Sequence, residues 1–170
     1  MGDPFETTRR QFHLPDGMIY LDGNSLGPMP RVAAERLARE IGNWREKLIG
    51  GWNDSGWIDL PMSVGDKIAR LIGASPGSVI AGDSTSVNLF KALTGALSLT
   101  TRKVVLSDSG NFPTDLYVAK GVADLLGEAR SLKVVAPADV AEAIDDSVAV
   151  LMLTEVDYRT GRLHDMARLT

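Results

Sequence analysis

The segment Val148-Ala-Val-Leu-Met-Leu-Thr154 constrains the fold more than any other, because its apolar residues are consecutive rather than alternating. A strand with apolar side chains on both faces must be covered on both sides, as in parallel sheets flanked by helices. Two shorter segments with β-branched residues, Lys103–Ser107 and Lys133–Ala136, predict further strands. Helical patterns separate the three segments, and this order favours right-handed parallel crossovers. The sequence therefore predicts an α/β fold with a mostly parallel sheet flanked by helices.

Amphipathic helices are predicted from Pro30 and from Pro61, because proline suits the first position of a helix. Each has apolar residues at helical spacing, which we expect to be buried. These residues are Leu37, Ile41, Trp44 and Leu48 in the first helix, and Val64, Ile68, Leu71 and Ile72 in the second. Upstream, Ile19-Tyr20-Leu21 indicates a short strand that leads into a glycine-rich turn.

The composition narrows the class of protein. With 44% apolar residues, the 170-residue chain can build a globular core. Its 18 basic and 22 acidic side chains are interspersed, so we expect no nucleic-acid partner. The absence of cysteine excludes disulfides, thiolate metal sites and cysteine nucleophiles, and it suits a cytoplasmic protein. We also expect no metal site. We expect no membrane partner, because no apolar run approaches the roughly 20 residues of a membrane helix.

Two polar turns follow apolar segments and are candidates for ligand binding. The first, Ser84-Thr85-Ser86, opens a helix, where free N–H groups and hydroxyls suit a phosphate, although the same residues are common helix caps. The second is the turn Phe112-Pro-Thr-Asp115. Both turns and Thr154 lie at strand ends or helix starts, where ligands collect in parallel sheets. These residues are therefore expected along one rim of the sheet.

Four segments, in order and with suitable separations, resemble the kynureninase family from about Ile19 to Thr170. They are Tyr20-Leu-Asp-Gly-Asn-Ser-Leu-Gly27, Gly51-Trp52 followed by Trp57, Asp83-Ser-Thr-Ser-Val-Asn-Leu89 and Asn111-Phe-Pro-Thr-Asp-Leu-Tyr117. The resemblance implies a pyridoxal 5′-phosphate (PLP) enzyme with the aspartate-aminotransferase fold (fold type I). Such enzymes are homodimers that cleave the Cβ–Cγ bond of L-kynurenine with water, giving anthranilate and L-alanine in tryptophan breakdown. Residues 1–60 would form an N-terminal helical arm, and residues 61–170 the first part of the PLP-binding large domain.

The resemblance also implies roles for single residues. Thr85 and Ser86 would bind the PLP phosphate, and Phe112 would stack on the pyridine ring. Pro113, Thr114 and Asp115 would shape the same turn, with Asp115 either near the ring or capping the next helix. Thr154 would make a polar contact with the cofactor. Ser25 and Trp52 would face the substrate, whereas without the resemblance Trp52 would be interpreted as a loop anchor.

The PLP lysine of the family belongs to a later segment, so the sequence assigns no catalytic residue to this chain. The six lysines lie on polar helix faces or at strand starts, and His13 and His164 are interpreted as surface or loop residues. We therefore expect an N-terminal portion of the enzyme that is inactive alone. Two alternatives remain: another fold-type-I PLP enzyme, such as a cysteine desulfurase or an aminotransferase, or a non-catalytic phosphate-binding or interaction module.

Overall fold

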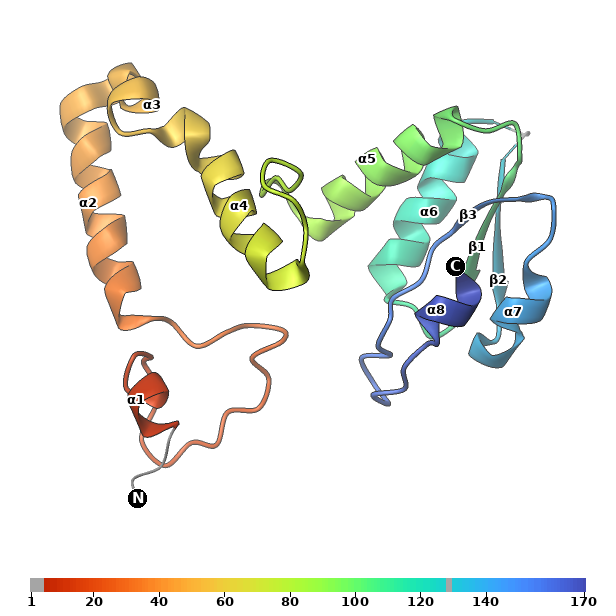
Figure 1. The fold of residues 1–170 in the computed structure, drawn as a ribbon, viewed down its shortest axis with the longest axis horizontal. Helices are drawn as coiled ribbons and strands as arrows, with labels where there is room; N and C mark the ends of the chain where they lie inside the picture. Colours follow the sequence, from red (N-terminus) through yellow and green to blue (C-terminus); the bar gives the residue numbers. More distant parts are fainter. Residues whose placement is uncertain (1–4, 128–129) are drawn as a thin grey trace. The chain divides into compact units, whose positions relative to one another are not determined.

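A computed structural model describes residues 5–127 and 130–170 of the chain. The chain divides into two compact units, one ending at Ala81 and the other beginning at Gly82 (Figure 1). In the first unit the helices and 3-10 turns are α1 (Glu6–Arg9), α2 (Arg31–Lys47), η1 (Leu48–Gly50), α3 (Gly51–Asp54), η2 (Trp57–Asp59) and α4 (Leu60–Ile72). The expected boundary after residue 60 stays a prediction.

The second unit contains a three-stranded parallel sheet in the order β2-β1-β3. Its strands are β1 (Val104–Asp108), β2 (Ser131–Val135) and β3 (Val148–Leu151). Its helices and 3-10 turn are α5 (Thr85–Ser98), α6 (Pro113–Leu125), η3 (Pro137–Asp139), α7 (Val140–Ala143) and α8 (Met166–Leu169). Figure 1 shows α5 and α6 on one side of the sheet and α7 on the other. The predicted α/β fold with a parallel sheet is therefore confirmed.

The core of the second unit lies between the sheet and the pair α5 and α6. Leu93 and Leu97 of α5 pack there with Val105 of β1 and with Ala119 and Val122 of α6. In the central strand β1, the four residues from Val105 to Asp108 are all buried, as expected for a strand covered on both faces. The strand β3 is less covered than its apolar run predicts, because it pairs with β1 alone among the described strands.

In the first unit, the two predicted helices form but their apolar stripes are not buried. Pro30 caps α2, and Pro61 lies in the first turn of α4. The expected burial is wrong for α2: Leu37, Ile41, Trp44 and Leu48 are 62–66% exposed, because no described element of this unit covers that face. It is also wrong for α4, where Val64, Ile68, Leu71 and Ile72 are 38–86% exposed.

The buried face of α4 consists of small residues instead. Gly65 and Ala69 are buried, and the backbone at Val79 lies directly against Gly65. A Cβ atom at Gly65 would lie 2.0 Å from the Val79 carbonyl oxygen, so only glycine allows this approach. The short strand expected at Ile19-Tyr20-Leu21 is absent, because the described residues offer it no partner strand.

One tryptophan of the first unit is anchored by both packing and a hydrogen bond. The ring of Trp57 lies against Gly51, and its Nε1 donates to the Glu40 carboxylate at 2.9 Å. The hydrogen bonds from Trp57 and Asn43 lower the pKa of Glu40 below its ordinary value.

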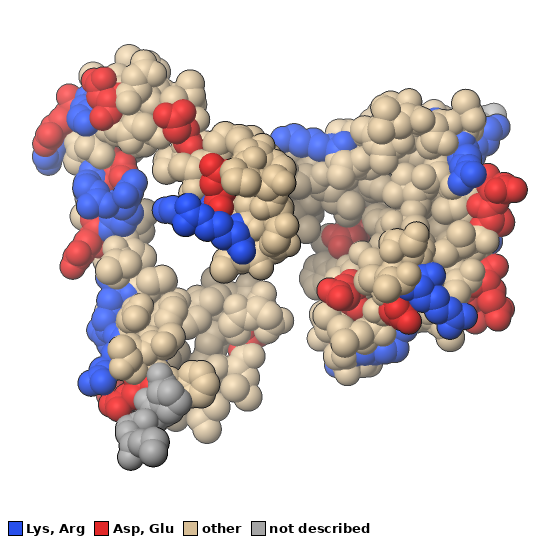
Figure 2. All heavy atoms as spheres, in the orientation of Figure 1, with Lys and Arg blue, Asp and Glu red and all other residues tan. Residues whose placement is uncertain are grey.

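In the face drawn in Figure 2, basic and acidic side chains are interspersed, without a continuous basic stripe. Among the described residues, no helix is long and apolar enough to cross a bilayer, and no group of three His, Asp or Glu side chains is placed to hold a metal ion.

Candidate functional site

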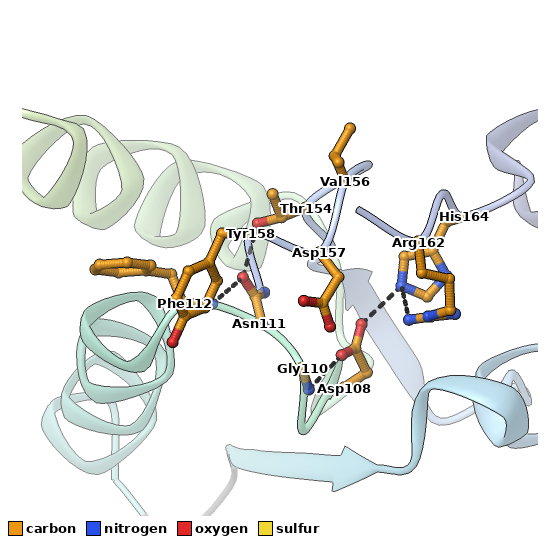
Figure 3. A pocket seen from close by; sticks show the side chains of 10 residues that line it. All are labelled: Asp108, Gly110, Asn111, Phe112, Thr154, Val156, Asp157, Tyr158, Arg162 and His164. Carbon is orange, nitrogen blue, oxygen red and sulfur yellow. Dashed lines mark hydrogen bonds and ion pairs between the residues drawn. The ribbon is translucent and has the colours of Figure 1, made fainter. Parts of the chain in front are cut away.

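Asn111 lies buried where the carboxyl ends of β1 and β3 meet (Figure 3). Its Oδ1 accepts a hydrogen bond from the backbone N–H of Phe112 at 2.7 Å and another from the Thr154 hydroxyl at 2.7 Å. Its Nδ2 donates to the Ser107 hydroxyl at 3.0 Å and, over a longer 3.4 Å, to the Met152 carbonyl. All four hydrogen-bonding positions of the amide are used. Asn111 thus joins the end of β1, the start of α6 and the segment after β3.

The ring of Phe112 stands at the start of α6 and is half exposed. Tyr158 packs against it edge to face, with the ring centroids 5.0 Å apart and an interplanar angle of 61°. The guanidinium of Arg159 lies 5.4 Å from the centre of the Tyr158 ring. Phe112 therefore has one neighbour that fixes its tilt and an accessible surface that another ring can cover.

Asp108 and His164 form a buried hydrogen-bonded pair beside Asn111 (Figure 3). One carboxylate oxygen of Asp108 accepts from the Gly110 N–H at 2.6 Å, and the other lies 2.8 Å from Nε2 of His164. Because an ionised carboxylate can only accept, Nε2 carries the proton of this bond. The Arg162 guanidinium lies 3.3 Å from the same nitrogen, so it contributes positive charge rather than a second hydrogen bond.

The prediction for His164 is therefore wrong in one respect. The residue belongs to an irregular segment, as expected, but it is only 9% exposed, and its ring contacts the buried Asp108. The pair links residues 56 positions apart, and no local pattern indicates it. His13 is exposed, as predicted.

A small cavity is lined by Asn111 on one side and by the Asp108–His164 pair on the other. Its volume of about 50 Å³ suits a few water molecules and is far below the roughly 300–1,000 Å³ of ligand pockets. A larger ligand would lie at its rim, where Phe112 and Thr154 are found. The lining residues are Asp108, Gly110, Asn111, Phe112, Thr154, Val156, Asp157, Tyr158, Arg162 and His164.

The loop below the cavity leaves little room for a side chain at position 110. A Cβ atom there would lie 2.9 Å from the carboxylate oxygens of both Asp108 and Asp157. The Asp157 carboxylate also accepts backbone N–H bonds from Arg159 and Thr160, which lower its pKa.

The hydroxyl-rich turn begins α5 as predicted. Ser84 is the N-cap, and its Oγ accepts from the Val87 N–H at 3.3 Å, which confirms the cap interpretation for this residue. Thr85 and Ser86 occupy the first two helical positions. Their hydroxyls make no hydrogen bond with the part of the chain that the structure describes. They are available to an anion at the helix N-terminus.

The turn at the start of α6 contains the other predicted residues. Pro113 and Thr114 are its first two helical positions, and Asp115 is the third. No side chain caps this helix among the described residues, so the capping role considered for Asp115 receives no support. Burial raises the pKa of the Asp115 carboxyl above its ordinary value.

Ser25 and Trp52 belong to the first unit. Ser25 lies in an exposed turn and donates its N–H to the Asp22 carbonyl at 3.1 Å. Trp52 lies on α3 with half of its surface exposed. Both side chains are accessible, and their predicted contact with substrate stays a prediction.

The lysines have the ordinary positions that the sequence indicates. Lys91 pairs with Asp83, Lys120 with Asp124, and Lys133 with Asp145. Lys47 donates to Ser55, and Lys67 and Lys103 are exposed. No lysine is among the described residues that line the cavity.

Three similar proteins found for this sequence have the same name. No family model matches the chain. Kynureninase from Burkholderia pseudomallei (strain 1106a) is 48% identical over 175 residues, covering 99% of the chain and 42% of that relative. Kynureninases from Pseudomonas fluorescens and Burkholderia mallei (strain ATCC 23344) are 46% and 47% identical, with the same coverage. The chain therefore spans about two-fifths of the length of these relatives, and neither alternative class of protein is favoured.

Proposed function

Because this chain belongs to the kynureninase family, we propose that it forms part of the active site of a PLP-dependent hydrolase acting on L-kynurenine. The reaction cleaves the Cβ–Cγ bond with water and yields anthranilate and L-alanine, and 3-hydroxykynurenine is a second substrate. The observation that carries the proposal is the 48% identity over 99% of the chain. In this proposal the full-length enzyme is a cytoplasmic homodimer. Residues 1–60 form its N-terminal arm, and residues 61–170 form the start of its large domain.

The residues of the second unit fit PLP in chemical type. Thr85 and Ser86 offer hydroxyls and N–H groups at the N-terminus of a 14-residue helix, which suits the phosphate. Phe112 offers an accessible aromatic face for the pyridine ring, and Thr154 offers a hydroxyl in the segment that follows β3. When bound, PLP supplies an electron sink for bond cleavage at the amino acid substrate.

The chain's own residues would bind and orient the cofactor and substrate. Pro113 and Thr114 fix the backbone that presents Phe112, and Asp115 adds a partly desolvated carboxyl to the same turn. Ser25 and Trp52 would contact the substrate. Since no lysine among the described residues lies at the cavity, the 170-residue chain by itself would not release anthranilate from kynurenine.

The phosphate assignment is tested by titrating the chain with PLP and with pyridoxal, which lacks the phosphate, and following visible absorption. Replacing both hydroxyls, in Thr85→Ala with Ser86→Ala, removes two charge-assisted hydrogen bonds. We expect PLP affinity to fall about tenfold or more while pyridoxal affinity stays unchanged.

Thr101→Ala is the matched control, because Thr101 is exposed beyond the opposite end of α5. It should leave both affinities unchanged. Equal losses for PLP and pyridoxal in the double variant, or no loss for either, would contradict the phosphate assignment. Anthranilate fluorescence from the unmodified chain with kynurenine would contradict the proposed inactivity.

A further inference from the structure

Two backbone groups fix the orientation of the Asn111 amide, because one can only donate a hydrogen bond and the other can only accept one. The backbone N–H of Phe112 can only donate, so the atom it meets at 2.7 Å is the amide oxygen. The carbonyl of Met152 can only accept, so the atom facing it is the amide nitrogen. These two bonds settle which end of the Asn111 side chain faces Thr154.

The fixed amide also determines the direction of the Thr154 hydroxyl. Its Oγ1 lies 2.7 Å from the Asn111 oxygen, which can only accept, so Thr154 must donate its single hydrogen there. What remains on Oγ1 are lone pairs. Toward the rim of the cavity, Thr154 is therefore a hydrogen-bond acceptor and not a donor (Figure 3).

Burial makes this arrangement costly to reverse. Asn111 is 5% exposed and Ser107 is fully buried, so neither can replace a lost partner with bulk water. An unsatisfied buried polar group costs about 1–3 kcal/mol, and low local polarity strengthens the bonds that are made. The hydrogen bonds of Asn111 therefore fix the positions of the Phe112 backbone and the Thr154 hydroxyl relative to each other.

We propose that Asn111 is a positioning residue that presents Thr154 to the ligand as an obligate acceptor. This inference rests on the proposed function in one respect: the ligand is taken to be PLP. The cofactor group that meets Thr154 is then a donor, such as a protonated pyridine nitrogen or an unionised hydroxyl. A phosphate oxygen does not suit this position, which agrees with a phosphate site at Thr85 and Ser86.

The ligand-free arm of the test uses NMR on the 170-residue chain. We expect the Thr154 hydroxyl proton to exchange slowly with water and to show a cross-peak to the Asn111 side chain. Asn111→Leu should abolish both signals, whereas Ser107→Ala, which removes a different partner of Asn111, should keep them. A rapidly exchanging Thr154 hydroxyl in the unmodified chain would overturn the proposal, whatever binds to it.

The ligand arm compares PLP with N-methyl-PLP and 3-deoxy-PLP, each of which lacks one candidate donor. The unmodified chain should bind one analogue about tenfold more weakly than PLP, and Asn111→Leu should reduce that difference to less than twofold. Thr154→Ser should keep the discrimination, and Thr154→Val should remove it. Equal binding of all three ligands, or discrimination that persists in Asn111→Leu, would overturn the proposal. Failure of PLP to bind at all would instead count against the proposed function, and the NMR arm would still decide the role of Asn111.

Discussion

At the scale of single residues, two aspartates near the cavity have pKa values that move in opposite directions. Burial raises the pKa of Asp115, so its ionised form is disfavoured in the folded protein. Backbone N–H groups of Arg159 and Thr160 lower the pKa of Asp157, so its ionised form is favoured. The same change of pH must therefore affect the two carboxylates differently.

We predict opposite pH dependence for Asp115→Asn and Asp157→Asn. The contribution of Asp115 to stability is greatest below its ordinary pKa of 3.8 and is lost as the pH rises through its higher folded-state value. The unmodified chain should thus lose stability relative to Asp115→Asn as the pH rises from about 3 to about 6. The contribution of Asp157 is present above its ordinary value and is lost as the pH falls. Urea unfolding at a series of pH values measures both trends, and the same sign for both variants would refute the prediction.

The sequence predicts residues at this scale only where local rules apply. Phe112 and Thr154 could be placed on one rim, because carboxyl ends of parallel strands meet at one edge of a sheet. The roles of Asn111 and His164 could not be predicted, since they depend on partners such as Thr154 and Asp108 that are distant in the chain. Asn111 begins one of the four segments that resemble the kynureninase family, and its position next to Phe112 is the one sequence feature that points to a role at the site.

At the scale of elements, α4 is held by a close approach of backbone rather than by its large apolar side chains. The carbonyl of Val79 occupies the space that a Cβ at Gly65 would need. The sequence indicated the helix correctly, through Pro61 and helical spacing. It could not indicate the buried face, because burial depends on which segment packs against the helix.

We predict that Gly65→Ala destabilises the first unit by about 1–3 kcal/mol or more, because the backbone must move to admit the methyl group. Gly42→Ala in α2 is the matched control, since nothing lies within 4 Å of a Cβ at that position. It should stabilise the helix by roughly 0.5–1 kcal/mol, as alanine does within helices. Urea unfolding followed by tryptophan fluorescence measures the stability of both variants, because the tryptophans of the chain lie in the first unit. A neutral effect of Gly65→Ala would contradict the packing described for α4.

At the scale of the whole molecule, burial is distributed unevenly. The second unit contains the fully buried Val105, Leu106, Ala119, Val122 and Val140. Among the described residues of the first unit, those that are buried are Gly51, Gly65 and Ala69. The fold class was predictable because strand order and apolar runs are local properties of the sequence. The weak burial of the first unit was not, since the stripe on α2 has the spacing of a packed helix.

We predict that amide hydrogen exchange separates the two units. The residues of β1 and α6 should exchange slowest, because buried apolar contacts surround them. The residues of α2 should exchange faster by at least tenfold, because their apolar side is open to water. Mass spectrometry of peptic fragments provides the measurement. Equal protection of α2 and β1 would show that the first unit is stabilised by contacts other than those described.

The parallel order of the sheet also affects how the protein is made. Val104 pairs with Ser131 on one side and with Val148 on the other, and both partners are synthesised long after it. The central strand therefore leaves the ribosome with two open edges, and it must wait for its neighbours. Pairings between distant segments also form slowly. We expect the nascent chain to be prone to association during that interval, and chaperones that bind exposed apolar segments to raise its yield.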